Sequence, residues 1–393
     1  MTATSSGPFE GARRAEGYLE ESVDTAGTSI ESTRTDIDQQ AAGYEVAKAA
    51  RQADEHGEPD DDRDEDVLLA DEDDPKAWGS ASTHLALIDE PEHLVAARGL
   101  RGLLVRATGG LLKIAPGRGE LVEVAASRRA LVDDRTIRQA TWTRAVSVLV
   151  ANRKGGVGKT PTALCLGGIL AAIRGGSVAI VEVSDDPGAL NFRAEGSPTL
   201  GLGELLRDID SITSAGQLAG YTAPQTSFAS VIGSVGRRDR LTRDEVVAAA
   251  ALVDEFYGIR VMDSGNQPTS SAFQGAVETA DVLVVPLLNA GDAALEALAL
   301  LDELHRAGGH AAELARRAII VRLTDGRPEA AHVTERIGRL LDRAKPAAVY
   351  EIPFDPHLAE RGQITVEKLA PATAAAFTRL AAGVVDVLKT AVH

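Results

Sequence analysis

Residues 148–164 read VLVANRKGGVGKTPTAL, an apolar run followed by a glycine-rich turn and the first residues of a helix. Gly155, Gly156 and Gly158 allow the backbone to curl so that successive amide groups point inward. The helix that follows adds the positive end of its dipole to these amides. Such a turn forms a nest for phosphate oxygens, and Lys159 stands where its ammonium group can reach them.

The sequence around this turn alternates short apolar runs with longer helical patterns. The runs of strand length are VSVLVA (146–151), SVAIVEV (177–183), IRVMDS (259–264), DVLVVPL (281–287), AIIVRL (318–323) and AAVYEIP (347–353). Continuous apolar strands between helices are typical of a parallel sheet that is covered on both faces. The sequence therefore predicts an α/β domain over residues 146–393, with a doubly wound, mostly parallel sheet. Its ligand site is expected at the carboxyl ends of the strands.

The N-terminal part of the chain has a different composition. The 393 residues carry a net charge of −17, and residues 1–100 account for all of it, with 25 acidic and 8 basic side chains. Residues 1–90 are too polar to offset the entropy lost on ordering, so we expect a disordered acidic tail. Residues 91–145 regain Leu, Val and Arg and are expected to form a helical lead-in.

Composition also argues against several classes of protein. Cys165 is the one cysteine in the sequence, so no internal disulfide is expected. No apolar run has the length of a membrane span, and the N-terminus lacks the core of a signal peptide. The last helix, with Phe377, Leu380, Val384 and Val387 on one face, is expected to pack in the core and not to anchor the protein in a membrane. We expect a cytoplasmic protein.

The turn reads K-G-G-x-G-K-T over residues 154–160, with Arg153 where a strict P-loop has its first glycine. This variant resembles the deviant Walker A motif of the ParA/MinD family of P-loop ATPases. RVMDSGNQP (260–268) is also similar to that family. YEIPFDPHLAERGQITVEKLAPATAAAF (350–377) looks like its actinobacterial members, including those that accompany type VII secretion. The resemblance extends over most of residues 100–393 and implies ATP and Mg²⁺ as ligands.

The resemblance assigns roles to residues of the turn. The Thr160 hydroxyl would hold Mg²⁺, and Asp263 would orient the ion through water. Lys154 would reach the nucleotide of a facing subunit, so that two chains form a homodimer on ATP. The nucleotide itself would be bound by Gly155, Gly156, Val157, Gly158, Lys159, Thr160 and Pro161.

Two departures from the family pattern concern the phosphates. Pro161 replaces a second Thr or Ser, and it has neither the hydroxyl nor the N–H that would contact the α-phosphate. Proline is tolerated in the first turn of a helix, so we expect weaker nucleotide binding but an intact fold. In the family's switch I, Glu182 and Ser184 occupy the positions of aspartates. Either Asp185 or Asp186 positions the attacking water, or these residues form an acidic loop without that role.

A third departure concerns the base. The strand that ends in an adenine-binding asparagine in the family reads AIIVRLTDG here, with Arg322 or Thr324 at that point. Pro353 and the residues after it would form the loop near the adenine. The selectivity for the base therefore stays open.

Two functions follow from the resemblance. The first is an ATP-dependent dimerising switch with weak hydrolysis, which partitions or positions a plasmid, a chromosome or a protein cargo. The second is a non-turnover or weakly active ATP-binding adaptor of a type VII secretion or conjugation apparatus. ParA-type proteins also bind nonspecific DNA through basic patches. The candidates here, which a solvated loop explains equally well, are Arg237, Arg238, Arg240 and Arg243.

Overall fold

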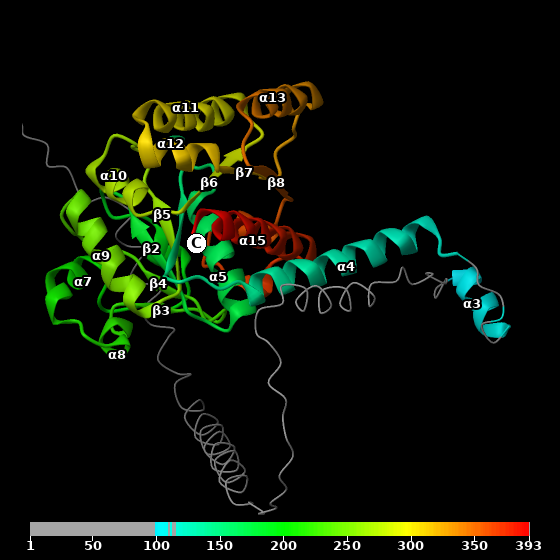
Figure 1. Ribbon diagram of the computed structural model, residues 1–393, viewed down its shortest axis with the longest axis horizontal. Coiled ribbons are helices and arrows are strands. Elements are labelled where there is room, and N and C mark those ends of the chain that lie inside the picture. The colour runs from blue at the N-terminus through cyan, green and yellow to red at the C-terminus, as the bar shows by residue number, and fades with distance from the viewer. Residues whose placement is uncertain (1–98, 109–110, 112–114, 393) are drawn as a thin grey trace, which may run out of the picture. The chain divides into compact units, whose positions relative to one another are not determined.

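The computed structural model describes residues 99–108, 111 and 115–392 (Figure 1). These described residues belong to one compact unit. The predicted acidic tail, residues 1–90, lies outside the described residues.

An eight-stranded sheet forms the centre of this unit. In chain order its strands are β1 (Val146–Val150), β2 (Val178–Val183), β3 (Ala223–Pro224), β4 (Ser230–Ile232), β5 (Ile259–Ser264), β6 (Val282–Leu288), β7 (Ile319–Leu323) and β8 (Ala348–Ile352). Across the sheet the order is β3-β4-β2-β5-β1-β6-β7-β8, and every neighbouring pair is parallel except β3 with β4. The six predicted strands are confirmed. Strands β3 and β4 were not predicted, because two or three residues carry no periodic pattern.

Helices cover both faces of the sheet, as the continuous apolar strands predict (Figure 1). Along β1, Val146, Val148 and Val150 pack into the core on one face, whereas Leu149 packs into the core on the other. The first core includes side chains of α4 (Arg118–Gln139), α5 (Lys159–Arg174), α6 (Leu190–Arg193) and α15 (Pro371–Ala391). The second includes side chains of α7 (Leu202–Asp208), α8 (Ala215–Ala219), α9 (Arg243–Phe256), α10 (Ser271–Glu278), α11 (Gly291–Ala307), α12 (Gly309–Arg316) and α13 (Ala331–Ala344). The remaining short elements are α3 (Gly99–Ala107), η3 (Ile209–Ser211), α14 (Pro356–Ala359) and η4 (Val366–Lys368).

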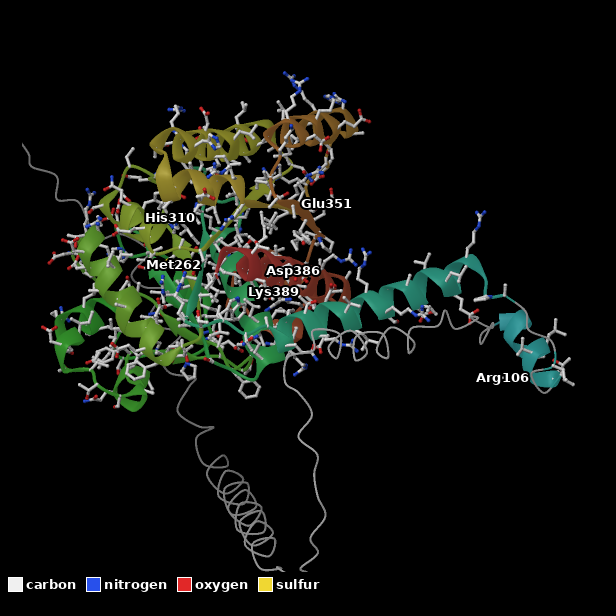
Figure 2. All side chains as sticks on the ribbon, viewed as in Figure 1. Arg106, Met262, His310, Glu351, Asp386 and Lys389 are labelled. Carbon is white, nitrogen blue, oxygen red and sulfur yellow. The ribbon has the colours of Figure 1, made fainter. Side chains whose placement is uncertain are left out.

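Helix α15 belongs to the core. By length and apolar composition it is the one helix among the described residues that could cross a membrane. Its apolar side chains, however, are used in packing: Phe377, Leu380 and Val384 are completely buried, as expected, and Val387 is partly buried against the same core. On its outer side Lys389 forms an ion pair with Asp386 at 3.2 Å (Figure 2). Helix α4 contacts both α15 and α5, so this part of the helical lead-in packs directly on the α/β unit.

Candidate functional site

The glycine-rich turn connects β1 to α5. Gly156 and Gly158 have φ angles of +76° and +94°, a backbone region that L-amino acids with a side chain rarely adopt. Helix α5 begins at Lys159, and no side chain caps its N-terminus. The free amide groups of the first helical turn are therefore available to a ligand, which is the arrangement that binds phosphate.

A cavity of about 830 Å³ opens at the carboxyl ends of the strands, a volume typical of small-molecule sites. It is lined by the turn and by residues that follow β2, β5, β7 and β8. Gly155 is not part of the lining; it lies against Asn266, whose Nδ2 would be 3.3 Å from a Cβ added at this glycine. The predicted nucleotide-binding residues that do line the cavity are Gly156, Val157, Gly158, Lys159, Thr160 and Pro161.

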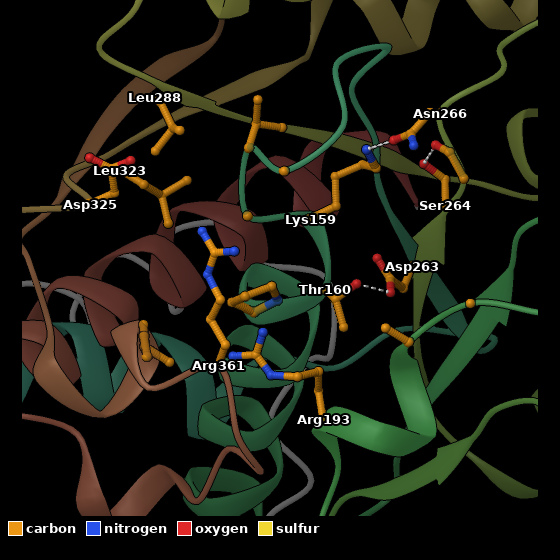
Figure 3. A pocket seen from close by; sticks show the side chains of 18 of the residues that line it. Lys159, Thr160, Arg193, Asp263, Ser264, Asn266, Leu288, Leu323, Asp325 and Arg361 are labelled. Carbon is orange, nitrogen blue, oxygen red and sulfur yellow. Dashed lines mark hydrogen bonds between the residues drawn. The ribbon is translucent and has the colours of Figure 1, made fainter. Parts of the chain in front are cut away.

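Lys159 places a buried ammonium group at one end of the cavity (Figure 3). Its Nζ donates hydrogen bonds to the carbonyl oxygen of Lys154, at 3.0 Å, and to the Asn266 side chain. Burial lowers the pKa of Lys159 to about 8, and the charge of Asp263 opposes this shift. None of its hydrogen bonds goes to a carboxylate among the described residues, so an anion in the cavity would provide the missing countercharge.

Thr160 and Asp263 meet beside this lysine. The Thr160 hydroxyl donates to Asp263 Oδ2 at 2.6 Å (Figure 3). The other carboxylate oxygen, Oδ1, is buried without a hydrogen-bond partner in the part of the chain that the structure describes. Burial raises the pKa of Asp263 to about 7, and the charge of Glu182 adds to this effect, while Thr160 and Lys159 oppose it.

These two residues fit a site for Mg²⁺. An orphaned carboxylate oxygen next to a hydroxyl is a place where a cation, or water bound to it, would satisfy a buried polar atom. The described residues contain no cluster of three or more His, Cys, Asp or Glu that could hold a metal alone. Mg²⁺ commonly keeps several waters and uses substrate phosphates as ligands, so it does not need such a cluster.

Lys154 lies outside the cavity. Its ammonium group is 2.7 Å from Asp292 Oδ2, near the N-terminus of α11, and both side chains are exposed. The hydrogen bond and charge of Asp292 raise the pKa of Lys154. Within one chain this side chain therefore sits on the surface next to the turn, and its role toward a second subunit stays a prediction.

The predicted basic cluster requires a correction. Arg238 is not exposed: its side chain is 5% exposed and forms an ion pair at 2.9 Å with Glu182, whose side chain is 1% exposed. Its guanidinium also donates to the carbonyl oxygens of Ser184 and Asp185 at 2.7 and 2.5 Å, and to Ser234 Oγ at 2.7 Å. The physical reason is that the buried carboxylate at the end of β2 needs a cation, and Arg238 provides it.

The other arginines of this cluster are exposed, but acidic side chains accompany two of them. Arg240 is 3.3 Å from Asp186, and Arg243 contacts Asp244 and Glu278. Arg237 is exposed at the surface. The four arginines therefore do not form a single exposed basic patch.

The loop after β2, residues 184–188, is called here the switch loop. Both Asp185 and Asp186 line the cavity. Glu182 does not line it as a free carboxylate, since Oε1 accepts hydrogen bonds from Arg238, Ser234 and the Gly188 backbone. Glu182 therefore holds the switch loop in place, and the carboxylates of the loop itself that line the cavity are those of Asp185 and Asp186.

At the opposite end of the cavity the lining is more apolar. Leu288, Leu323, Pro353 and Phe354 contribute to it, together with Thr324. Arg322, the other residue of this segment that could contact the base, is not part of the cavity lining. Its guanidinium donates hydrogen bonds to Asn289 at 2.9 Å and to Glu351 at 2.7 Å.

Among the cavity residues that the sequence did not point to are two arginines. Arg193, the last residue of α6, and Arg361, which follows α14, both line the cavity. They stand singly in NFRAEG and AERGQ. The second stretch lies within residues 350–377, whose resemblance to the family is described above, but nothing in that resemblance singles out Arg361.

Comparisons with known proteins agree with this architecture. Residues 148–365 match the family model of the CobQ/CobB/MinD/ParA nucleotide-binding domain. ESX-1 secretion-associated protein EspI of Mycobacterium tuberculosis, in strains CDC 1551 and H37Rv, is 27% identical over 251 residues. The match covers 61% of this chain and 36% of EspI, so the chain spans about a third of the length of that curated relative.

A solved structure gives the same fold. The ParA family ATPase from Chlorobium tepidum TLS superposes with a TM-score of 0.51 at 17% identity, over 60% of this chain and 98% of that one. With a parallel sheet, a glycine-rich turn before α5 and a family match over more than half of its length, the chain belongs to the CobQ/CobB/MinD/ParA family of nucleotide-binding domains.

Proposed function

We propose that the protein is an ATP-binding switch of the ParA/MinD type, which dimerises on ATP and hydrolyses it weakly. The observation that carries this proposal is the meeting of Thr160 with Asp263, whose second oxygen has no partner among the described residues, beside the buried ammonium of Lys159. A hydroxyl, a carboxylate and a lysine at the end of a glycine-rich turn match the needs of a nucleotide triphosphate with Mg²⁺.

Each of these residues has a role in the proposed mechanism. Lys159 would exchange its hydrogen bonds to Lys154 and Asn266 for the β- and γ-phosphate oxygens. Thr160 and Asp263 would hold Mg²⁺, which when bound neutralises charge that develops on the transferred phosphoryl group. Asp185 or Asp186, on the switch loop, would orient the attacking water.

Dimerisation is proposed to depend on Lys154. Its present partner is exposed Asp292, and exposed ion pairs of this kind contribute little to stability. The side chain would therefore leave Asp292 at small cost and contact the nucleotide of a facing subunit. The dimer would then bind ATP more tightly than the monomer, and mass action would link the two equilibria.

A second function has support from one comparison. EspI is a secretion-associated protein, and its similarity favours an ATP-binding adaptor of a type VII secretion apparatus over a partitioning switch. The tight attachment of the switch loop through Glu182 and Arg238 is also consistent with weak turnover.

Two lysine variants test the proposal. Lys159→Ala should lose ATP binding, whereas Lys154→Ala should keep much of it and remain monomeric. Lys389→Ala, on the exposed side of α15, is the matched control and should behave as the parent. Calorimetric titration and light scattering with ATP and with ADP give both readouts. A parent that does not bind ATP contradicts the proposal, and a parent that binds ATP without dimerising leaves the adaptor as the function.

A further inference from the structure

Two arginines from distant parts of the sequence converge in the cavity. Arg193 ends α6, and Arg361 follows α14 with a φ angle of +56°. Arg193 Nε donates to the carbonyl oxygen of Gly362 at 2.6 Å, so its side chain is tied to the backbone next to Arg361. In the view of Figure 3 the Arg361 side chain points into the space between the apolar end, with Leu323, and the phosphate end, with Thr160, and the Arg193 side chain lies below Thr160.

The charges of these two arginines are not balanced within the described chain. Neither Arg193 nor Arg361 forms an ion pair with any carboxylate among the described residues, whereas Arg327, also in the cavity lining, pairs with Asp325 at 2.5 Å. Arg193 Nη2 is buried and makes no hydrogen bond to another described residue. Burial lowers the pKa of Arg193, and the charge of Arg361 lowers it further. Two neighbouring guanidinium groups, one with a buried free donor, are a site for an anion.

The start of α5, which lines the same cavity, lacks one hydrogen-bond donor for a phosphate. The first turn of α5 consists of Lys159, Thr160 and Pro161, and the proline has no N–H and no hydroxyl. An anion bound along this turn would therefore receive fewer hydrogen bonds from the helix than the turn normally offers. Pro161 lines the cavity together with both arginines.

We propose that Arg193 and Arg361 bind the α-phosphate of the nucleotide and replace the donors that Pro161 lacks. The inference rests on the proposed function, namely that this cavity binds ATP. Lys159, Thr160 and Asp263 serve the β- and γ-phosphates, so the next phosphate toward the apolar end is the one that meets the two arginines. A guanidinium fork matches two oxygens of one phosphate, and loss of Arg193 or Arg361 therefore affects ADP as strongly as ATP.

The first experiment measures affinity. ATP and ADP are titrated into the parent, Arg193→Gln, Arg361→Gln and the control Arg306→Gln, which changes an exposed arginine of α11 paired with Asp302. Each cavity variant should bind both nucleotides roughly 10- to 100-fold more weakly, the range expected for a hydrogen bond to a charged group. The control should match the parent. Because Arg361 is exposed, its variant stays folded even if Arg193→Gln does not.

The second experiment identifies the phosphate. The two diastereomers of ATP with sulfur on the α-phosphate should bind the parent with different affinities, and Arg361→Gln should reduce that difference. Pro161→Thr, which restores an N–H and a hydroxyl, should improve ATP binding more in the Arg361→Gln background than in the parent, because the two sets of donors serve one phosphate.

The outcomes separate the inference from the proposed function. A parent that does not bind ATP contradicts the proposed function. A parent that binds ATP, while Arg193→Gln and Arg361→Gln bind it as tightly, overturns the inference alone. Unchanged discrimination between the diastereomers in Arg361→Gln also overturns it, since the arginine then acts elsewhere on the nucleotide.

Discussion

Replacing Arg238 with methionine should destabilise the protein strongly. The substitution leaves the Glu182 carboxylate, 1% exposed, without its cation. Removing one partner of a buried ion pair typically costs about 3–5 kcal/mol. Because Glu182 keeps hydrogen bonds from Ser234 and from the Gly188 backbone, we expect a loss near the lower end, about 3 kcal/mol. The carbonyl oxygens of Ser184 and Asp185 lose their donor at the same time.

Urea unfolding followed by circular dichroism measures this loss, with the slope m compared between variants. The control is Arg240→Met, which breaks an ion pair to Asp186 whose side chains are 76% and 68% exposed. That change should lower the free energy of unfolding by less than about 1 kcal/mol. The double variant Glu182→Met, Arg238→Met should be more stable than Arg238→Met, because no charge is left buried.

The reasoning is refuted if Arg238→Met is as stable as the parent. It is also refuted if the double variant is less stable than Arg238→Met, since the loss would then come from packing and not from an unpaired carboxylate.

Two further predictions concern the cavity, and a third concerns the acidic N-terminal residues. Burial raises the pKa of Asp263 to about 7. Without Mg²⁺, the contribution of Asp263 to the free energy of unfolding is therefore complete below pH 3.8, the ordinary pKa of an aspartate, and is lost as the pH rises through 7. Asp263→Asn should flatten this pH dependence in thermal unfolding, and an unchanged profile would contradict the prediction. The double change of Asp185 and Asp186 to Ala should abolish ATP turnover in a phosphate-release assay, and parental turnover would exclude both. Deleting residues 1–90, which carry the net charge of −17, should raise any affinity for duplex DNA through Arg237, with a steep salt dependence; no DNA signal in the truncated chain would remove DNA as a partner.

The central fold could be predicted because its signals are local. Each of the six long strands is an apolar run that can be read without its neighbours, and the glycine-rich turn follows the first of them directly. Thr160 and Asp263 were predicted to share a metal site, and they meet because β1 and β5 are adjacent parallel strands that end at one edge of the sheet. The structure shows the contact between these two residues, and their role in Mg²⁺ binding stays a prediction.

The arginines could not be predicted because their environment depends on tertiary contacts. Arg238 lies in a run of basic residues that reads as a solvated loop, but in the structure it is buried and pairs with Glu182, which lies near the end of β2 and far away in the sequence. Arg193 and Arg361 are single basic residues, and although Arg361 lies in the segment 350–377 that resembles the family, nothing in the sequence links it to Arg193. The packing of α6 and the segment after α14 brings the two together. Charge patterning detects clusters along the chain, and it is insensitive to clusters that form across the fold.

The buried attachment of the switch loop limits how this protein can respond to ATP. A ligand shifts an equilibrium only by the difference in its contacts with the two states. Arg238 fixes the backbone of the loop by donating hydrogen bonds to the carbonyl oxygens of Ser184 and Asp185. These hydrogen bonds are present in the chain without a nucleotide. By contrast, the side chains of Lys154 and Asp186 form exposed ion pairs, which a phosphate or a second subunit could replace at little cost. A response to ATP is therefore expected in these two side chains, with the backbone of the loop remaining in place, and this combination favours dimerisation without fast hydrolysis.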